Sequence, residues 1–126
     1  MAISQKRSKR KSTGGRYKNS FSKKKAHNGS NPILTKIGSL KVKVLRVLGG
    51  NEKYKTMFAE EVNVANAKGK IQKDIIVNVV DNSANRNYIR RNIITKGALV
   101  ELKSGKKAKI TSRPGQEKVL NAVLVE

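Results

Sequence analysis

The first 31 residues combine dense positive charge with too little apolar material to form a core. They contain ten lysines and arginines and no carboxylate, so the segment carries +10. Six of these 31 residues are apolar, against 40 of the remaining 95. Ordering a residue costs about 1–2 kcal/mol of conformational entropy, which so little burial cannot offset. We expect residues 1–31 to be an extension that is disordered alone in water, and residues 32–126 to be the folded domain.

The folded part is basic as well. It holds 19 bases and 8 acids, which leaves 19 − 8 = +11 of the total +21. Charge of one sign opposes compaction unless a polyanion neutralises it, so nucleic acid is the first candidate partner and an anionic membrane the second. No apolar run approaches the roughly 18 residues that span a bilayer. We therefore expect no membrane role and a cytoplasmic location.

The residue types needed for catalysis are scarce. The chain has no cysteine and one histidine, His27, which leaves no thiolate, no common zinc site and no Ser-His-Asp relay. Glu60 and Glu61 are adjacent, and neighbours on a strand point to opposite faces. Gly14-Gly15 lacks the spacing of a phosphate-binding P-loop. We predict a protein that is not an enzyme, with no cofactor, metal or small-molecule substrate.

The sequence after Pro32 has the period of β-strands. Apolar side chains alternate with lysine in residues 40–44, which predicts one set facing inward. Residues 45–48 break this alternation, and Gly49-Gly50-Asn51 accept the positive φ of a tight turn. A period-two run resumes at Tyr54 and continues to Val64. These features predict a hairpin over residues 40–64.

Further short strands are separated by turns. Residues 75–80 are apolar on both faces, which predicts a central strand in which an aspartate at Val77 would unfold the domain. Residues 81–92 read as a loop with room for one helical turn. Later strands are expected over residues 98–103, 108–111 and 119–125. Strands at this spacing predict an all-β fold, a small barrel or sandwich of about six short strands behind the long basic extension.

The extension holds the first candidate site. Lys and Arg neutralise phosphates, and Ser and Thr hydroxyls and bare glycine backbone can approach phosphate oxygens closely. The alternative is a solvated tail or an import signal. Tyr17 and Phe21 would either stack on unpaired bases or pack onto the barrel. The predicted contacts are Lys6, Arg7, Lys9, Arg10, Lys11, Thr13, Gly14, Gly15, Arg16, Tyr17, Lys18, Lys23, Lys24 and Lys25.

The second candidate site is the irregular segment 82–92. Its amides, arginines and tyrosine suit recognition of folded RNA through phosphate, sugar hydroxyl and base edge. The alternative is a polar loop whose asparagines bond to their own backbone. The predicted contacts, with two residues from later basic turns, are Asn85, Arg86, Tyr88, Arg90, Arg91, Lys96 and Arg113.

Several stretches, taken in order, resemble a known family. They are Lys11-Ser12-Thr13-Gly14-Gly15-Arg16, Thr35-Lys36-Ile37-Gly38, Gly49-Gly50-Asn51, Asn85-Arg86, Arg90-Arg91-Asn92-Ile93-Ile94-Thr95-Lys96-Gly97-Ala98, Ser112-Arg113-Pro114-Gly115-Gln116 and Asn121-Ala122-Val123-Leu124. The chain resembles small-subunit ribosomal protein eight of the archaeal and eukaryotic type over essentially its whole length, in its shorter archaeal form. The bacterial protein of the same number is unrelated.

The resemblance implies a structural component of the small ribosomal subunit. Its partners would be small-subunit ribosomal RNA and neighbouring ribosomal proteins, with a β-barrel body on the RNA and the extension threaded into it. The chain departs from the family at Ala26-His27-Asn28, where an aromatic and an acid are usual, and at Ser83, where proline is common. Those departures leave the path of residues 26–31 open.

Two other functions compete with this interpretation. An architectural, chromatin-like protein that binds DNA could share both the charge and the small β-body. An enzyme acting on RNA would need catalytic groups that the sequence lacks. Binding of duplex DNA in competition with ribosomal RNA separates the first alternative, and turnover of labelled RNA the second.

Overall fold

The computed structural model describes residues 3–18, 22, 24–66 and 69–125, which form two units, Met1–Pro32 and Ile33–Glu126. The turn expected at residues 67–70 falls partly outside these ranges, although Asn66 and Lys70 close it with a backbone hydrogen bond of 2.9 Å from N to O. Gly69 in this turn has φ of 77°, the conformation in which glycine is favoured. Each unit is described by itself.

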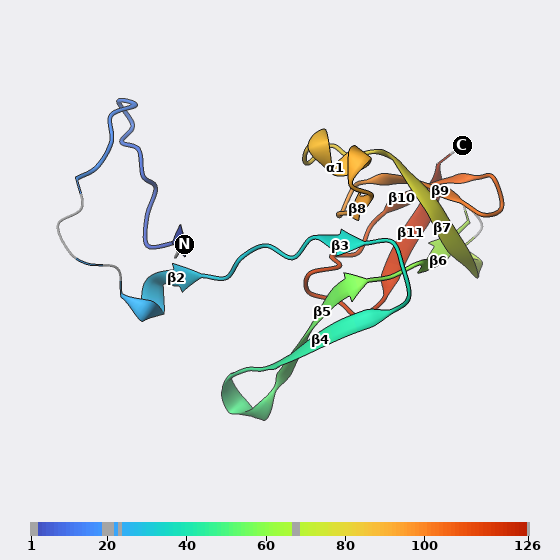
Figure 1. Ribbon diagram of the computed structural model, residues 1–126, viewed down its shortest axis with the longest axis horizontal. Helices are drawn as coiled ribbons and strands as arrows, with labels where there is room; N and C mark the ends of the chain where they lie inside the picture. Colours follow the sequence, from blue (N-terminus) through green and yellow to red (C-terminus); the bar gives the residue numbers. More distant parts are fainter. Residues whose placement is uncertain (1–2, 19–21, 23, 67–68, 126) are drawn as a thin grey trace. The chain divides into compact units, whose positions relative to one another are not determined.

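The second unit is built around a closed barrel of five strands in the order β10-β11-β6-β7-β9 (Figure 1). These are β6 Glu61–Ala65, β7 Ile71–Asp81, β9 Leu99–Leu102, β10 Lys107–Ile110 and β11 Leu120–Val125. β6 and β11 run parallel, and the other pairs are antiparallel. The predicted small all-β barrel is confirmed. Closure leaves these strands without free edges.

The core of this unit fills the inside of the barrel. Buried side chains alternate along the strands, as at Val62 and Val64 of β6, while their neighbours face outward. The parallel pairing sets Leu120 opposite Val62 and Ala122 opposite Val64, so the same face of β11 is buried. The buried cluster comprises Ala59, Val62, Val64, Ile76, Val79, Ile94, Ala98, Val100, Leu102, Ala108, Ile110, Leu120 and Ala122.

Strand β7 is buried on one face, so the predicted two-sided burial is wrong. Ile76 and Val79 enter the core, whereas Val77 is 56% exposed. The register against β9 shifts between Ile76 and Asn78 and again between Val79 and Asp81. Such irregularities allow Ile76 and Val79, which are three positions apart in the sequence, to face the same side of the strand. A closed barrel buries only the inward face of each strand. Among the described residues, no second layer covers the apolar residues on the outer face of β7.

A second sheet has the order β4-β5-β3-β8, with β3 Thr35–Lys36, β4 Lys41–Arg46, β5 Glu52–Phe58 and β8 Ile93–Ile94. The predicted hairpin is therefore shorter than expected, since it ends at Phe58. After Ala59 the chain changes sheet, because Glu60 O accepts a hydrogen bond from Ile76 N at 2.8 Å and β6 joins the barrel. This sheet and the two-residue strands also raise the strand number above the six expected.

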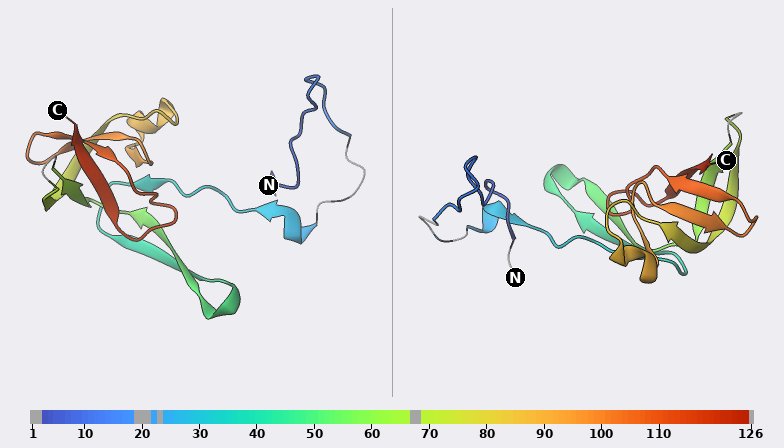
Figure 2. Two further views of the ribbon diagram at one scale, coloured as in Figure 1. Left: turned by 180° about the vertical axis from the view of Figure 1, so that it is seen from behind. Right: turned by 90° about the horizontal axis from the view of Figure 1, so that it is seen from above.

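The free part of the hairpin extends away from the barrel (Figures 1 and 2). Its inward apolar set was predicted from alternation, yet Val42 is half-buried and Val44 is 50% exposed. The base of the hairpin is anchored by Thr56, whose N donates to Pro114 O at 2.9 Å and whose Oγ1 donates to Glu117 O at 2.8 Å. The alternation correctly predicts a β-strand here, but the apolar side chains of that strand do not form a core.

The first unit contains short local structure. Strand β1 Ile3–Ser4 pairs antiparallel with β2 Asn28–Gly29. A 3-10 helix at Lys25–His27 directly precedes β2. This answers the question of the path of residues 26–31: the 3-10 helix ends at His27, strand β2 covers residues 28 and 29, and residues 30 and 31 are irregular. None of residues 4–18, 22 and 24–32 is buried. Disorder of this segment alone in water stays a prediction.

Candidate nucleic-acid interface

The basic stretch of the first unit forms a small loop, which we name the basic loop, residues 9–17. Tyr17 N donates to Lys9 O at 3.2 Å, Lys11 N to Gly15 O at 2.7 Å and Gly14 N to Lys11 O at 3.0 Å. Gly14 has φ of 84°, which an L side chain rarely adopts, and a Cβ there would meet no atom within 4 Å. Gly14 therefore serves to bend the backbone.

Cations surround the ring of Tyr17. The Arg7 guanidinium carbon lies 4.1 Å from the ring centroid and Lys11 Nζ lies 5.7 Å from it, both within the range of cation–π attraction. Arg10 Nη1 donates to Gly14 O at 3.0 Å. Tyr17 thus organises the positive charges of its own unit, a role not among the two considered from sequence. The ring remains 41% exposed.

The predicted contacts in the extension lie at the surface wherever they are described. Lys23 and Phe21 fall outside the described residues, so the structure gives no placement for them. The basic loop holds eight of the predicted positions on one turn of chain, while Lys24 and Lys25 lie at the 3-10 helix. The exposed residues are Lys6, Arg7, Lys9, Arg10, Lys11, Thr13, Gly14, Gly15, Arg16, Tyr17, Lys18, Lys24 and Lys25.

The second candidate segment is held by a buried asparagine. Asn82 Nδ2 donates to Ile93 O at 3.1 Å, and its Oδ1 accepts from Ala84 N at 3.0 Å and Thr95 Oγ1 at 2.9 Å. Asn85 Oδ1 accepts from Asn87 N at 2.9 Å. These two asparagines do bond to local backbone, as the structural alternative foresaw. Asn82 fastens the segment to the chain around β8, and this fixes where the arginines stand.

The helical turn expected in this segment is α1, Asn87–Arg90. Tyr88 and Ile89 are half-buried, whereas Arg86, Arg90 and Arg91 are exposed, so one turn of helix separates apolar from basic side chains. Asn92 then takes φ of 49°, a left-handed conformation that asparagine tolerates. α1 and β8 lie at the same end of the unit in Figure 1.

Lys96 is brought close to this segment, and Arg113 belongs to another turn. Lys96 is exposed beside Gly97, where a Cβ would lie 3.4 Å from Ser83 Oγ. Arg113 is exposed in the β10–β11 connection, where its carbonyl accepts from Gln116 N at 2.9 Å. The structure therefore places Lys96 next to a residue that approaches Ser83, at the start of this segment, while Arg113 lies in the connection that hydrogen-bonds to β5.

The structure also gathers four lysines that the sequence pattern did not single out. We name them the lysine face of the β4–β5 hairpin, because antiparallel pairing and alternation put Lys41, Lys43, Lys53 and Lys55 on one side. Lys43 lies directly opposite Lys55, and Lys53 opposite Leu45. The signal available in the sequence was lysine at every second position on both arms of an expected hairpin.

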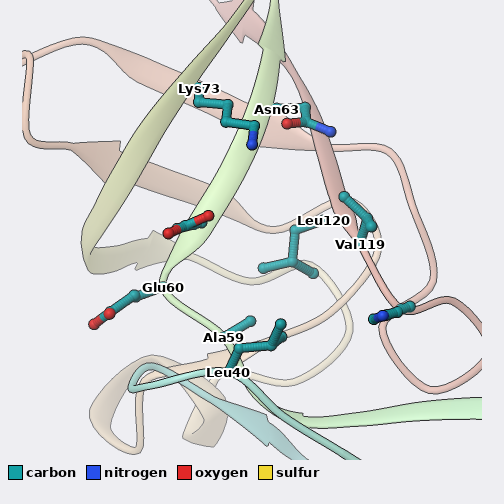
Figure 3. Close-up of a pocket in the computed structure, with 9 residues that line it drawn as sticks. Leu40, Ala59, Glu60, Asn63, Lys73, Val119 and Leu120 are labelled. Atoms are coloured by element: carbon teal, nitrogen blue, oxygen red, sulfur yellow. The ribbon is translucent and has the colours of Figure 1, made fainter.

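A pocket of about 270 Å³ opens on the body near the start of β6 (Figure 3). Its apolar part includes Leu40, Ala59 and Leu120, and its charged residues are Glu60, Glu61, Lys73 and Lys118. Two acids and two bases balance there. A phosphate gains no net attraction from such a lining, so this pocket is not part of the candidate interface.

Two ionisable groups outside the basic clusters have shifted pKa values. Ser104 Oγ donates to Asp74 Oδ2 at 2.6 Å, and this hydrogen bond to the charged form lowers the pKa of Asp74. Tyr54 OH donates to Glu52 Oε2 at 3.1 Å, which raises the pKa of Tyr54 through that hydrogen bond and the Glu52 charge. Both bonds hold a carboxylate near the surface in a fixed place.

Metal-binding clusters and membrane-spanning helices are both absent from the part of the chain that the structure describes. Among the described residues, no group of three or more histidine, cysteine or acidic side chains is placed to hold a metal ion. Within the same residues, no helix is both long and apolar enough to cross a bilayer.

Comparisons with known proteins agree over nearly the full length of the chain. The family model described as "Ribosomal protein S8e" matches residues 4–125. Relatives named "Small ribosomal subunit protein eS8" include one from Methanocorpusculum labreanum, 50% identical over 95% of this chain and 96% of its own length. Another, from Methanobrevibacter smithii, is 47% identical over 99% of this chain and 100% of its own. The chain belongs to the ribosomal protein S8e family.

Proposed function

We propose that this chain is a structural constituent of the small ribosomal subunit that binds and stabilises ribosomal RNA in translation. The observation that carries the proposal is the match to relatives named as small-subunit proteins, which covers nearly all of both chains. The proposed partners are small-subunit ribosomal RNA and neighbouring ribosomal proteins, and the proposed location is the ribosome in the cytoplasm. The chain has no proposed catalytic role.

The extension contributes affinity in this proposal. Its lysines and arginines neutralise phosphates and release the counterions condensed on RNA, which offsets the entropy lost when the segment orders. The exposure of the basic loop and the 3.0 Å bond that holds Arg10 to it support this role. Arg10 and Arg16, directly paired across the loop, then present two planar donor groups to the phosphates.

In this proposal, the arginines at the end of the body around α1 fix how the protein is positioned on the RNA. Asn82 anchors the segment with three hydrogen bonds, so Arg86, Arg90 and Arg91 are carried by a rigid support. Fixed arginines recognise the shape of folded RNA better than arginines on a free chain, because less side-chain and backbone entropy is lost on binding. The extension and this surface would act at different places on the RNA.

Competition binding at one stated salt concentration tests the proposal. The full chain is bound to labelled small-subunit ribosomal RNA and challenged with unlabelled RNA or duplex DNA of equal length. We expect the ribosomal RNA to compete better. Better competition by duplex DNA would favour the architectural DNA-binding alternative, which no observation on this chain supports.

A second test uses the assembled particle. The native protein should sediment with small subunits and stay with them through a high-salt wash, because an extension and a body that bind at separate places must both dissociate before the protein is released. Full release into the supernatant would contradict a structural role. A peripheral protein from another compartment, added before the wash, serves as the control for trapping.

A further inference from the structure

The β4–β5 hairpin is a basic arm whose charges are unbalanced on one side. On the lysine face, Lys43 and Lys55 are direct cross-strand partners. Directly opposed residues have Cβ atoms about 4.5–5.5 Å apart, and like charges in that position destabilise a sheet. The hairpin therefore carries a repulsion that an external anion would relieve.

No carboxylate of the hairpin can relieve it from within. The one acid of residues 41–57 is Glu52, which lies opposite Arg46 in the strand register and accepts a hydrogen bond from Tyr54 OH. Glu52 and Tyr54 alternate with Lys53 and Lys55, so they lie on the other face of β5. The two faces thus differ in chemistry, because one carries four lysines and the other carries Val44, Tyr54, one acid and one base.

The arm is held in shape while projecting from the body. Its tip is closed by Val47 N donating to Asn51 O at 2.8 Å, with Gly49 and Gly50 at φ of 74° and 75°. Its base is tied to the body by Thr56. Leu48 at the tip is 94% exposed, and a two-stranded hairpin with so little burial is marginal alone in water.

We propose that the lysine face of this hairpin is a further docking surface for the phosphate backbone of ribosomal RNA. The inference rests on the proposed function and adds a surface to it. Lysines two apart on a strand are about 7 Å apart, so Lys41 with Lys43 and Lys53 with Lys55 form a patch that follows a run of phosphates. Because lysine ammonium groups act as point charges, this surface supplies affinity and orientation without reading sequence.

The test is the salt dependence of ribosomal RNA binding by the full-length double variant Lys43→Gln/Lys55→Gln. Neutralising two fewer phosphates should reduce the slope of log affinity against log salt by about 1.5 and weaken binding roughly tenfold at low salt. The matched control is Lys73→Gln/Lys103→Gln, which removes the same charge from exposed positions on β7 and just after β9. We expect affinity to fall less than half as much in the control.

Two further measurements separate a binding effect from a folding effect. Lys43→Arg/Lys55→Arg keeps the charge and should bind as tightly as the parent, and the glutamine variant should melt no lower than the parent because a repulsion is removed. Equal losses of affinity in the hairpin and control variants, or an unchanged slope, would overturn the inference while leaving ribosomal RNA binding intact. A parent chain that does not prefer ribosomal RNA to duplex DNA would instead overturn the proposed function and the inference together.

Discussion

The extension and the barrel hold similar total charge and are built in opposite ways. Residues 1–31 carry +10 and show no buried side chain among residues 4–18, 22 and 24–31, whereas the remaining residues carry +11 around a buried cluster of thirteen apolar residues. In the barrel, apolar burial holds basic side chains at the surface. In the extension, hydrogen bonds in the basic loop and cation–π attraction to Tyr17 do the organising, so its full order should depend on an external anion.

The sharpest way to break this comparison is a charge in the barrel core. Val79→Asp should abolish folding, because an unpaired carboxylate at a site 1% exposed costs several kcal/mol against a total stability of about 5–15 kcal/mol. Val77→Asp, on the outer face of the same strand, should change stability by less than about 1 kcal/mol. Urea denaturation followed by circular dichroism measures both. Equal destabilisation would show that β7 is enclosed on two sides after all.

Removing the extension tests the other half of the comparison. Deletion of residues 1–31 should leave the melting temperature of the body nearly unchanged and weaken binding of ribosomal RNA by about 100-fold or more at low salt. The slope of log affinity against log salt concentration should fall by about 0.7–0.9 for each phosphate that the shortened chain no longer neutralises. Filter binding over a salt series gives both quantities. An unchanged slope would mean that the extension does not touch phosphate.

Asn82 and Asn85 lie in the same segment, and truncating each one compares the stability contributed by a buried side chain with that contributed by an exposed one. Asn82→Ala should cost about 2–3 kcal/mol, because it removes three hydrogen bonds and leaves Ile93 O, Ala84 N and Thr95 Oγ1 to find other partners. Asn85→Ala, at an exposed position, should cost well under half of that. Chemical denaturation of the two variants checks the ratio. Similar costs would contradict the anchoring role given to Asn82.

The smallest expected effect concerns Ser104 and pH. The hydrogen bond from Ser104 lowers the pKa of Asp74 in the folded state, so it contributes stability above the unfolded pKa of an aspartate and loses it as the pH falls through the folded value. Ser104→Ala should destabilise the body slightly at neutral pH and have no effect in strong acid. Melting curves at several pH values detect the difference. A constant difference down to the lowest pH would assign it to packing rather than to this carboxylate.

Much of the fold was accessible from local pattern. Period-two alternation located β4, the positions of the turns located β9, β10 and β11, and the four asparagines of the segment around Arg86 indicated an irregular connection with one helical turn. The expected barrel followed from strand length and spacing. Alternation could not tell an inner face from an outer one at Val77 and Val44, since burial depends on whether another layer covers the strand. The end of the hairpin at Phe58 was missed for the same reason, because the change of sheet depends on a hydrogen bond to distant Ile76.

The sequence by itself determined where positive charge exceeds apolar content, and with it the division between a basic extension and a β-rich body in a family of ribosomal proteins. Charge and composition are sums over neighbouring residues, so no fold is needed to read them. Tertiary structure alone decided that Gly97 approaches Ser83, that Asn82 is buried, and that Lys43 lies opposite Lys55. Those relations come from strand register and long-range hydrogen bonds, which join residues far apart in the chain.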